Sequence, residues 1–477
     1  MSRFLPPAWH PTAALTLLAG SLLATPALGA TPLPSPAPKA PQSLAASQSL
    51  ADTQGQWPVD GWWRAYGDDQ LSALIAEGMQ GATDLRVAQA RYAAAAATVG
   101  DARGALLPTL SGNADAGSAK QSYNYLFPAA FAPKGWRETG QASINLNWEI
   151  DFWGKNRAAL RAAKADRAAA EAEAAAARLA VSTGIATAYA DLAATYAEQD
   201  AAQEAAKIRA QTLALIEQRR DQGLENEGAV ARARANLASA QGDLAAIDEQ
   251  ITLGRHRLAA LVGAGPDRGL SIARPAVAHL ASPGLPENIP AQLLGRRPDM
   301  VAARARAEAA GERIRVARAA FYPNINLSAL IGLQSLGLSN LVKSGSEYGS
   351  VGPAVSLPIF DGGRLSARKH GAEADYALAV AQYDGTLVHA LQDIADAATS
   401  RQELTRRLSS AQAAQAAAQS AWNVANNRYR GGLATVLDVL VAEDSLIAAR
   451  RATAALQTRA FALDVALVRA LGGGFQA

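Results

Sequence analysis

The chain has 477 residues, and its 45 lysine and arginine residues nearly balance 42 aspartate and glutamate residues, for a formal net charge of +3. This balance argues against a nucleic-acid partner held by bulk charge. The absence of cysteine excludes disulfides, thiolate metal sites, a cysteine nucleophile and a lipid-modified N-terminal cysteine. Five scattered histidines lack a metal-binding spacing, so we expect neither a metal nor another cofactor.

The N-terminal stretch is typical of a secretory signal. Ala13–Ala24 is apolar but shorter than the ~20 residues of a spanning helix, and the small residues of Ala27–Gly29 fit a cleavage site. We therefore expect a signal peptide over residues 1–29, with a disordered or anchoring N-terminus as the alternative. Residues 30–56 are rich in proline, serine, alanine and glutamine, which predicts a flexible tether.

The remaining sequence repeats its landmarks at matching intervals. Asp84–Pro108 and Asp299–Pro323 both span 24 residues, and Gly154–Gly223 and Gly363–Gly432 both span 69. Such coincidence predicts a tandem structural repeat, in which one supersecondary unit is built twice.

The repeat sets the expected domain boundaries. We predict a first repeat over residues 57–263, a linker or equatorial region over residues 264–298 and a second repeat over residues 299–477. The middle region is rich in proline and glycine, which favours a connecting segment over a continued helix.

The long interval in each half is predicted to be one helix. Apolar residues recur there every three or four positions, as in a coiled-coil seam, and proline is absent. At 1.5 Å per residue such a helix reaches ~100 Å, so two shorter helices stacked end to end can pair along it. The seam residues are Val181, Ile185, Tyr189, Leu192 and Tyr196 in the first half, and Tyr376, Val380, Tyr383, Leu387, Leu391, Ile394 and Ala398 in the second.

Each half also carries a predicted strand pair ahead of its long helix. Ser143–Phe152 alternates apolar and polar residues, and its partner is Leu107–Ala119. The second half offers Asn324–Leu333 and Val351–Phe360. The apolar face of Ser143–Phe152 is the expected lipid face, formed by Ile144, Leu146, Trp148 and Ile150.

Four strands are too few to close a barrel, and their edges need partners. A membrane barrel shared between subunits would satisfy them, and twelve strands from three chains would leave a lumen, whereas eight from two would pack solid. A soluble two-layer sheet is the alternative.

Together these landmarks resemble the TolC-type outer-membrane factors, in particular the multidrug efflux branch. The resemblance runs from Trp57 to the C-terminus. Its motifs, in order, are Trp62-Trp63, Asp69–Leu71, Trp148–Gly154, Arg296–Asp299, Phe321–Pro323, Leu357–Arg364 and Leu471–Gly474.

The resemblance implies an α+β membrane protein in the outer membrane of a Gram-negative bacterium, with a large periplasmic portion. It implies a homotrimer whose twelve-stranded barrel, four strands per chain, continues into a long α-helical coiled-coil tunnel. Its implied partners are a periplasmic membrane-fusion adaptor, an inner-membrane pump and outer-membrane lipid. Without an N-terminal cysteine, anchoring would depend on the barrel.

The expected adaptor contacts lie at the turns that follow the two long helices. Gly223 and Gly432 suit a positive φ there, and Leu224 and Leu433 are apolar residues beside them. The leucines either dock the adaptor or pack within their own turn.

The resemblance also implies a periplasmic gate, at Tyr429 and Asp438. Two family positions depart from the pattern, because Val441 replaces a second carboxylate and Ala434 a basic partner. Asp438 equally fits a capping box with Thr435.

Glu225 and Glu227 in the first turn region add further gate candidates. Threefold symmetry would make a ring of three carboxylates from each. Each equally fits a solvated helix start that the helix dipole favours.

The function that follows is a passive exit duct for drugs and other small toxic compounds in a tripartite efflux pump. No nucleotide loop, nucleophile motif or metal spacing indicates an enzyme. Two alternatives stay open: the outer-membrane duct of a type I protein-secretion system, and a periplasmic coiled-coil structural protein without a pore.

Overall fold

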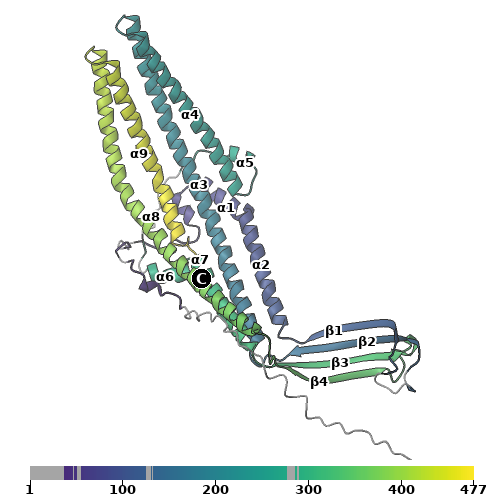
Figure 1. Ribbon diagram of the computed structural model, residues 1–477. Helices are drawn as coiled ribbons and strands as arrows, with labels where there is room; N and C mark the ends of the chain where they lie inside the picture. Colours follow the sequence, from purple (N-terminus) through teal and green to yellow (C-terminus); the bar gives the residue numbers. More distant parts are fainter. Residues whose placement is uncertain are drawn as a thin grey trace, which may run out of the picture.

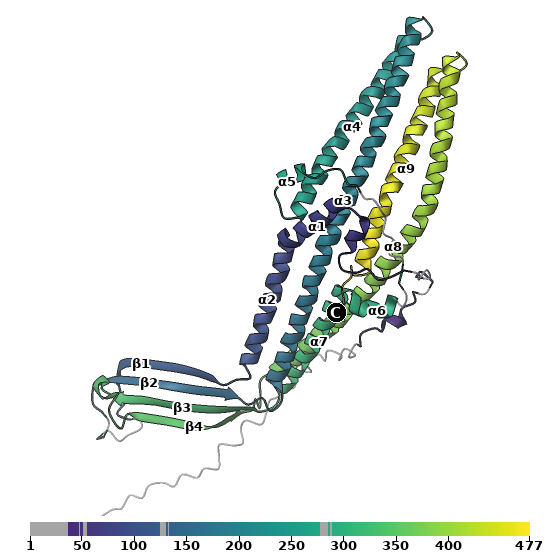
Figure 2. The ribbon, with the colours of Figure 1, turned by 180° about the vertical axis from the view of Figure 1, so that it is seen from behind.

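The described chain is long and narrow, with a sheet at one end and two helical hairpin tips at the other (Figures 1 and 2). The computed structural model describes residues 37–46, 48–50, 55–124, 130–131, 133–276, 285–286 and 289–477. The predicted signal peptide lies outside these residues. None of the helices they form is long and apolar enough to span a membrane.

The α-helices and strands follow one another in the order that the repeat predicts. Around them lie the short 3-10 helices η1 (Pro41–Ser43), η2 (Trp62–Tyr66) and η3 (Leu338–Asn340). The main elements are α1 (Asp69–Gly81), α2 (Thr83–Gly104), β1 (Thr109–Lys120), β2 (Trp136–Glu149), α3 (Lys155–Asp221), α4 (Glu227–Leu261), α5 (Asp267–Leu270), α6 (Ile289–Arg296), α7 (Pro298–Ala319), β3 (Asn324–Leu336), β4 (Glu347–Ser356), α8 (Arg364–Arg430) and α9 (Val436–Ala470).

The order α2, β1, β2, α3, α4 recurs as α7, β3, β4, α8, α9. Helices α3 and α8 are each 67 residues long, as the proline-free intervals predict. Helix α3 packs against α2 along one part and α4 along the other, and α8 packs in the same way against α7 and α9. The prediction of one long helix paired by two shorter ones is therefore confirmed, whereas the exact domain boundaries remain a prediction.

Both long helices begin in the same way, directly after the sheet. Gly154 and Gly363 precede them with φ of 76° and 84°, a left-handed conformation that glycine adopts without strain. One turn earlier, Asp151 accepts hydrogen bonds from the backbone N–H of Asn156 (3.0 Å) and Arg157 (2.8 Å). Asp361 likewise accepts from the N–H of Gly363 (3.0 Å), just before α8, and of Leu365 (2.7 Å), the second residue of α8. These carboxylates satisfy N–H groups that a helix start leaves free.

The predicted seams form the helical core. In α3 all five seam residues are buried, and they join the short helices α1 and η2 in the largest apolar cluster. In α8 the seam residues from Val380 to Ile394 are buried as well, and Tyr376 and Ala398 are partly buried.

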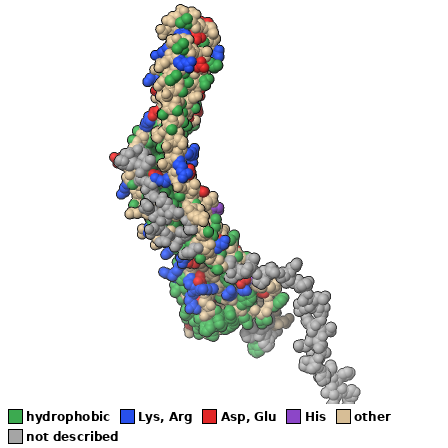
Figure 3. All heavy atoms as spheres, turned by 90° about the vertical axis from the view of Figure 1, so that its left-hand side faces the viewer, with side chains coloured by type: hydrophobic (Ala, Val, Ile, Leu, Met, Phe, Trp, Pro, Cys, Tyr) green, Lys and Arg blue, Asp and Glu red, His purple; other side chains and the backbone are tan. Residues whose placement is uncertain are grey.

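The strands form one antiparallel sheet in the order β1-β2-β3-β4. Ile144 in β2 lies opposite Gly112 and Ile331, and its neighbour Asn145 lies opposite Ser111 and Leu330. Because paired residues share a face, one face is mainly apolar and the other mainly polar. The apolar face includes Leu110, Ile144, Leu146, Trp148, Leu327, Ile331, Val351 and Val355. Figure 3 shows hydrophobic side chains gathered at this end of the molecule.

The strand boundaries differ from those that the sequence predicts, most of all in β2 and β4. Strand β2 begins at Trp136, seven residues before the predicted start at Ser143. Strand β2 ends at Glu149, so Ile150 is not part of the sheet. The N–H of Ile150 still donates to the carbonyl of Ile325 (2.8 Å), but the chain then turns at Asp151 to start α3. Strand β4 covers Glu347–Ser356 instead of Val351–Phe360. The alternation of apolar and polar residues extends beyond the last hydrogen-bonded pairs of the sheet. Exposed apolar residues continue into the junction with the helices, so the predicted strands end too late.

Some residues of the predicted N-terminal tether pack against the helices, although most of its described residues are exposed. Leu50 is buried with Leu293 of α6 and Leu391 of α8, and the N–H of Lys39 donates to Asp384 (2.9 Å). The composition of this segment predicts a flexible tether. In the structure, its leucines pack against apolar residues of α6 and α8.

Candidate functional site

The two hairpin tips lie together at the end of the molecule opposite the sheet (Figure 1). Each long helix ends in the same hydrogen-bond pattern. Leu224 N–H donates to the carbonyl of Arg219 (2.9 Å), and Leu433 N–H donates to that of Arg428 (2.8 Å). Gly223 and Gly432 have φ of 74° and 77°. This is the Schellman arrangement, which explains why glycine stands at both turns.

The leucines at these turns project into solvent. Leu224 is 59% exposed and Leu433 is 72% exposed. Exposure alone does not exclude an apolar contact within the Schellman turn, so packing within the turn stays an alternative to docking. Because both side chains are exposed, a partner can reach them, and burying them on binding would be favourable. Their contact with an adaptor remains a prediction.

Two of the predicted gate residues meet across the hairpins. The hydroxyl of Tyr429, at the end of α8, donates to the carboxylate of Glu225 in the α3–α4 turn (2.9 Å). Tyr429 is 1% exposed, in a cluster with Ile216 of α3 and Val230 of α4. Burial and the Glu225 carboxylate together raise the pKa of Tyr429, so its hydroxyl stays protonated and donates this bond.

Arg219 completes this contact, although sequence reasoning does not single it out. Its guanidinium carbon lies 4.5 Å from the centre of the Tyr429 ring, and Nη1 donates to the Tyr429 carbonyl (2.8 Å). A cation over an aromatic face is favourable, more so where water is excluded. In the sequence Arg219 resembles any arginine at a helix C-terminus, so its only signal is a favourable interaction with the helix dipole.

Asp438 forms the capping box that the sequence allows. Its carboxylate accepts from the Thr435 N–H (2.7 Å) and the Thr435 hydroxyl (2.8 Å), and Thr435 accepts from the Asp438 N–H (3.4 Å). These bonds from Thr435, with the nearby charge of Arg428, lower the pKa of Asp438. The capping role is confirmed, and the exposed carboxylate stays charged at neutral pH.

Glu227 lies in the first turn of α4, where the helix dipole favours a negative charge. It is exposed and pairs with Arg220 (3.3 Å). The N-cap of α4 is Asn226, whose side chain accepts from the Ala229 N–H (3.0 Å). The structure thus joins Tyr429 to Glu225, while the bonds described for Glu227 and Asp438 each stay within one tip.

A second polar contact joins the hairpins further from the tips. The Thr212 hydroxyl of α3 donates to the carboxylate of Glu443 in α9, and Arg209 lies 3.7 Å from the same carboxylate. Glu443 is 1% exposed, and burial raises its pKa against the opposing effects of Thr212 and Arg209. Sequence reasoning misses this contact, because each residue reads as an ordinary polar position of a helix.

Comparison with known proteins identifies a family, curated relatives and solved structures that resemble this chain. The family described as outer membrane efflux protein matches residues 74–264 and 289–473. Fusaric acid resistance protein FusA of Burkholderia cepacia is 37% identical over 65% of this chain and 59% of FusA, so the match spans less than two thirds of that relative. Pyoverdine export outer membrane protein OpmQ of Pseudomonas putida is 30% identical over 87% of this chain and 88% of OpmQ. The crystal structure of the outer membrane protein VceC of Vibrio cholerae has a TM-score of 0.83 and 47% identity, over 88% of this chain and 100% of VceC.

Proposed function

The chain belongs to the outer membrane efflux protein family and is an efflux channel of the Gram-negative outer membrane, and we propose that three copies form the exit duct of a tripartite pump. In this assembly the sheets make a twelve-stranded barrel with lipid on its apolar face. The helices continue the barrel as a tunnel through the periplasm.

The observation that carries this proposal is the two-faced sheet, whose outer strands β1 and β4 lack a second partner strand among the described residues. Strands β1 and β4 are each paired on one side within the chain. Pairing β4 of one copy with β1 of the next satisfies these edges, and closure satisfies every backbone group, as a membrane requires. With four strands per chain, two copies would give a barrel filled by side chains, whereas three leave room for a lumen.

Extraction and mass measurement test this proposal. The protein should resist washing from membranes, dissolve in detergent and give a light-scattering mass of three chains after correction for detergent. A protein that washes off without detergent would support the structural, non-pore alternative. A monomer that keeps its full helicity would contradict the shared barrel.

For cargo, we propose drugs and other small toxic compounds that pass through the duct without energy input from this chain. A periplasmic adaptor and an inner-membrane pump would collect and drive them. Relatives named for fusaric acid resistance and pyoverdine export support such cargo over the proteins of a type I secretion duct. Deleting the gene should raise sensitivity to small toxic compounds and leave the set of secreted proteins unchanged.

We place the gate at the hairpin tips, because a resting duct open to the periplasm would leak. The Tyr429–Glu225 hydrogen bond supports this placement, since it holds the end of α8 against the first tip. Asp438 and Glu227 are exposed carboxylates of the same tips, and threefold symmetry would turn each into a charged ring. The exposed Leu224 and Leu433 beside Gly223 and Gly432 form the proposed adaptor contact.

A further inference from the structure

The two repeats correspond residue by residue where the sheet meets the helices. Helices α2 and α7 are both 22 residues long, and α3 and α8 are both 67 residues long. The pair Thr109 and Asn147 of β1 and β2 has its counterpart in the pair Asn324 and Ser356 of β3 and β4. Counterparts can therefore be counted from the helix starts, at 83 and 298 for α2 and α7 and at 155 and 364 for α3 and α8.

One ion pair of the second repeat has no equivalent in the first. Arg318, near the end of α7, lies 3.8 Å from Glu373 of α8. By position in the helices, their counterparts are Arg103 of α2 and Lys164 of α3. Both are exposed, and among the described residues neither forms an ion pair or a side-chain hydrogen bond. Two cations thus stand where the other repeat holds opposite charges, and an anion between them would relieve their repulsion.

The end of α2 is fixed against the start of α3, where a third cation lies. The side-chain amide of Asn156 donates to the carbonyl of Ala105 (3.3 Å). The next residue, Arg157, pairs with Asp151, but its own side chain is 58% exposed whereas that of Asp151 is only 9% exposed. Arg157 precedes Lys164 by seven residues, or about two turns, so both side chains share one face of α3. An approaching molecule therefore meets cations from both helices.

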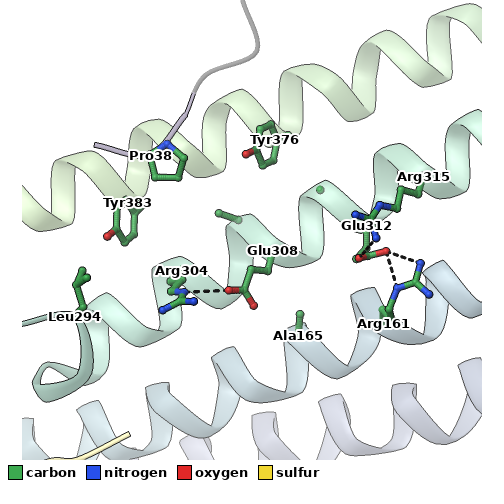
Figure 4. A pocket seen from close by; sticks show the side chains of 12 residues that line it. Pro38, Arg161, Ala165, Leu294, Arg304, Glu308, Glu312, Arg315, Tyr376 and Tyr383 are labelled. Atoms are coloured by element: carbon green, nitrogen blue, oxygen red, sulfur yellow. Dashed lines mark hydrogen bonds and ion pairs between the residues drawn. The ribbon is translucent and has the colours of Figure 1, made fainter. Parts of the chain in front are cut away.

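The second repeat shows which face of the helices carries these positions. A pocket there is lined by Arg315 of α7, Tyr376 of α8 and Pro38 of the N-terminal segment (Figure 4). The ion pair between α7 and α8 lies three residues from each of these helical positions, so it shares their face. In the proposed trimer this face is the outer one, because three N-terminal segments inside the tunnel would obstruct it. The counterparts Arg103 and Lys164 therefore face outward as well.

The three cations border the apolar surface of the sheet. Leu107 lies one turn beyond the α2 cation and is exposed, as are Phe152 and Trp153 just before α3. The Trp153 ring is held in place, because it stacks on Tyr322 with 4.7 Å between ring centres. Aromatic side chains between an apolar surface and charged groups are typical of the headgroup level of a membrane.

We propose that Arg103, Arg157 and Lys164 form a site on each chain that binds the phosphate of an anionic phospholipid, an inference that rests on the proposed barrel in the outer membrane. Guanidinium groups bind phosphate through paired hydrogen bonds, and the lysine ammonium adds a compact charge. The acyl chains of the lipid extend along Leu107 and Leu110 toward the apolar face of the sheet, a contact that free phosphate cannot make. The site lies on the helical side of the sheet, so the lipid belongs to the leaflet that faces the periplasm.

Native mass spectrometry of the full-length trimer in detergent, titrated with dioleoyl phosphatidylglycerol, tests this site. The wild type should retain the lipid on each chain, and dioleoylglycerol, which has the same acyl chains and no phosphate, should bind about tenfold more weakly or worse. Lys164→Glu gives the first repeat the opposite charges of the second, so it should weaken binding of phosphatidylglycerol about tenfold or more. Arg103→Gln combined with Lys164→Gln should have the same effect.

The matched control is Arg232→Gln combined with Arg407→Gln. It removes two exposed cations from α4 and α8 and leaves the junction with the sheet unchanged. Its binding of phosphatidylglycerol should stay within about twofold of the wild type. Equal loss in this control, wild-type affinity in Lys164→Glu, or equal binding of dioleoylglycerol would each overturn the proposal. Displacement of the lipid by millimolar inorganic phosphate would also overturn it, in favour of a site for free phosphate.

Light scattering and ion conductance of the same preparations separate this site from the duct on which it rests. Conducting trimers without a preference for phosphatidylglycerol would refute the lipid site and leave the proposed duct intact. A monomer that retains its helicity and does not conduct would instead refute the duct itself.

Discussion

The hydroxyl of Tyr429 donates a 2.9 Å hydrogen bond to Glu225, although 204 residues separate the two in the chain. The bond joins the last turn of α8 to the turn between α3 and α4. Through this bond, two side chains of the predicted gate connect one hairpin to the other near the tips. Because the Tyr429 hydroxyl is the donor, removing that one oxygen atom removes the bond.

Asp438 is predicted to serve both as a helix cap and as part of the gate. Asp438→Ala should lose the capping box and the charge, so α9 should fray at its start and block by multivalent cations should weaken. Asp438→Asn keeps an oxygen acceptor, so it should retain most of the cap and still lose cation block. Amide exchange at the start of α9 and conductance in planar bilayers measure the two effects. Unchanged block in both variants, on intact trimers, would remove Asp438 from the gate and leave Glu225 and Glu227.

The lipid face of the sheet predicts a position-dependent cost for charge. Ile144→Arg, in the middle of β2 and opposite Ile331, should cost roughly 2–4 kcal/mol if it lies near the membrane midplane. Ile150→Arg should cost less, because Ile150 lies beyond the strand at the junction with α3. Asn145→Arg, on the polar face, is the matched control. Equal loss of heat-resistant trimers in Ile144→Arg and Asn145→Arg would contradict the assignment of faces.

The exposed leucines predict a binding defect without a folding defect. Leu433→Ser and Leu224→Ser should weaken adaptor binding about fivefold or more, since each removes apolar area from the contact. Surface plasmon resonance with immobilised trimers measures this. Leu253→Ser on α4 is the control, because Leu253 is 56% exposed and lies far from the tips. If all three variants bind the adaptor equally, the tips are not the contact.

A buried carboxylate predicts the pH dependence of stability. Burial raises the pKa of Asp464 to about 6, and the nearby Arg401 opposes this only in part. The unfolded value is about 3.9, so this group stabilises the fold fully below about pH 4, and that contribution is lost as the pH rises through about 6. Asp464→Asn should therefore flatten the fall in thermal midpoint between pH 4 and 7.

The control for this change is Asp101→Asn, at an exposed position of α2. This variant should show the same fall in thermal midpoint between pH 4 and 7 as the wild type. Glu443 also has a raised pKa and acts in the same direction, so some slope should remain in Asp464→Asn. A slope identical to that of the wild type would show that Asp464 does not titrate in this range.

Local pattern predicts most of the fold. The seam from Val181 to Tyr196 identifies α3 because each apolar step follows the helix period, and the turn glycines Gly223 and Gly432 mark its end and that of α8. The end of β2 is not predictable in this way. Ile150 continues the alternation of apolar and polar residues, but the Asp151 carboxylate bonds to the start of α3, and the chain leaves the sheet there. An alternating pattern alone does not show where a strand gives way to a helix.

In the candidate site too, local contacts could be predicted from the sequence and long-range contacts could not. The capping box of Asp438 and Thr435 is local and is readable from four consecutive residues. The contacts of Tyr429 with Glu225 and Arg219, and of Thr212 with Glu443, join residues more than 200 positions apart. Such pairs depend on how the two hairpins pack, which no single stretch of sequence specifies.

The most direct test of the duct and its gate is single-channel conductance of purified trimers, comparing the wild type with Tyr429→Phe. The variant deletes one hydroxyl, and with it the bond to Glu225, while the ring under Arg219 is kept. Tyr376→Phe on the same helix is the control, because Tyr376 lies near the start of α8, beside α7 (Figure 4), whereas Tyr429 lies at the end of α8. The account predicts small discrete conductance steps in the wild type and in Tyr376→Phe, and larger steps in Tyr429→Phe. Equal steps in all three, or no steps from intact trimers, would contradict it.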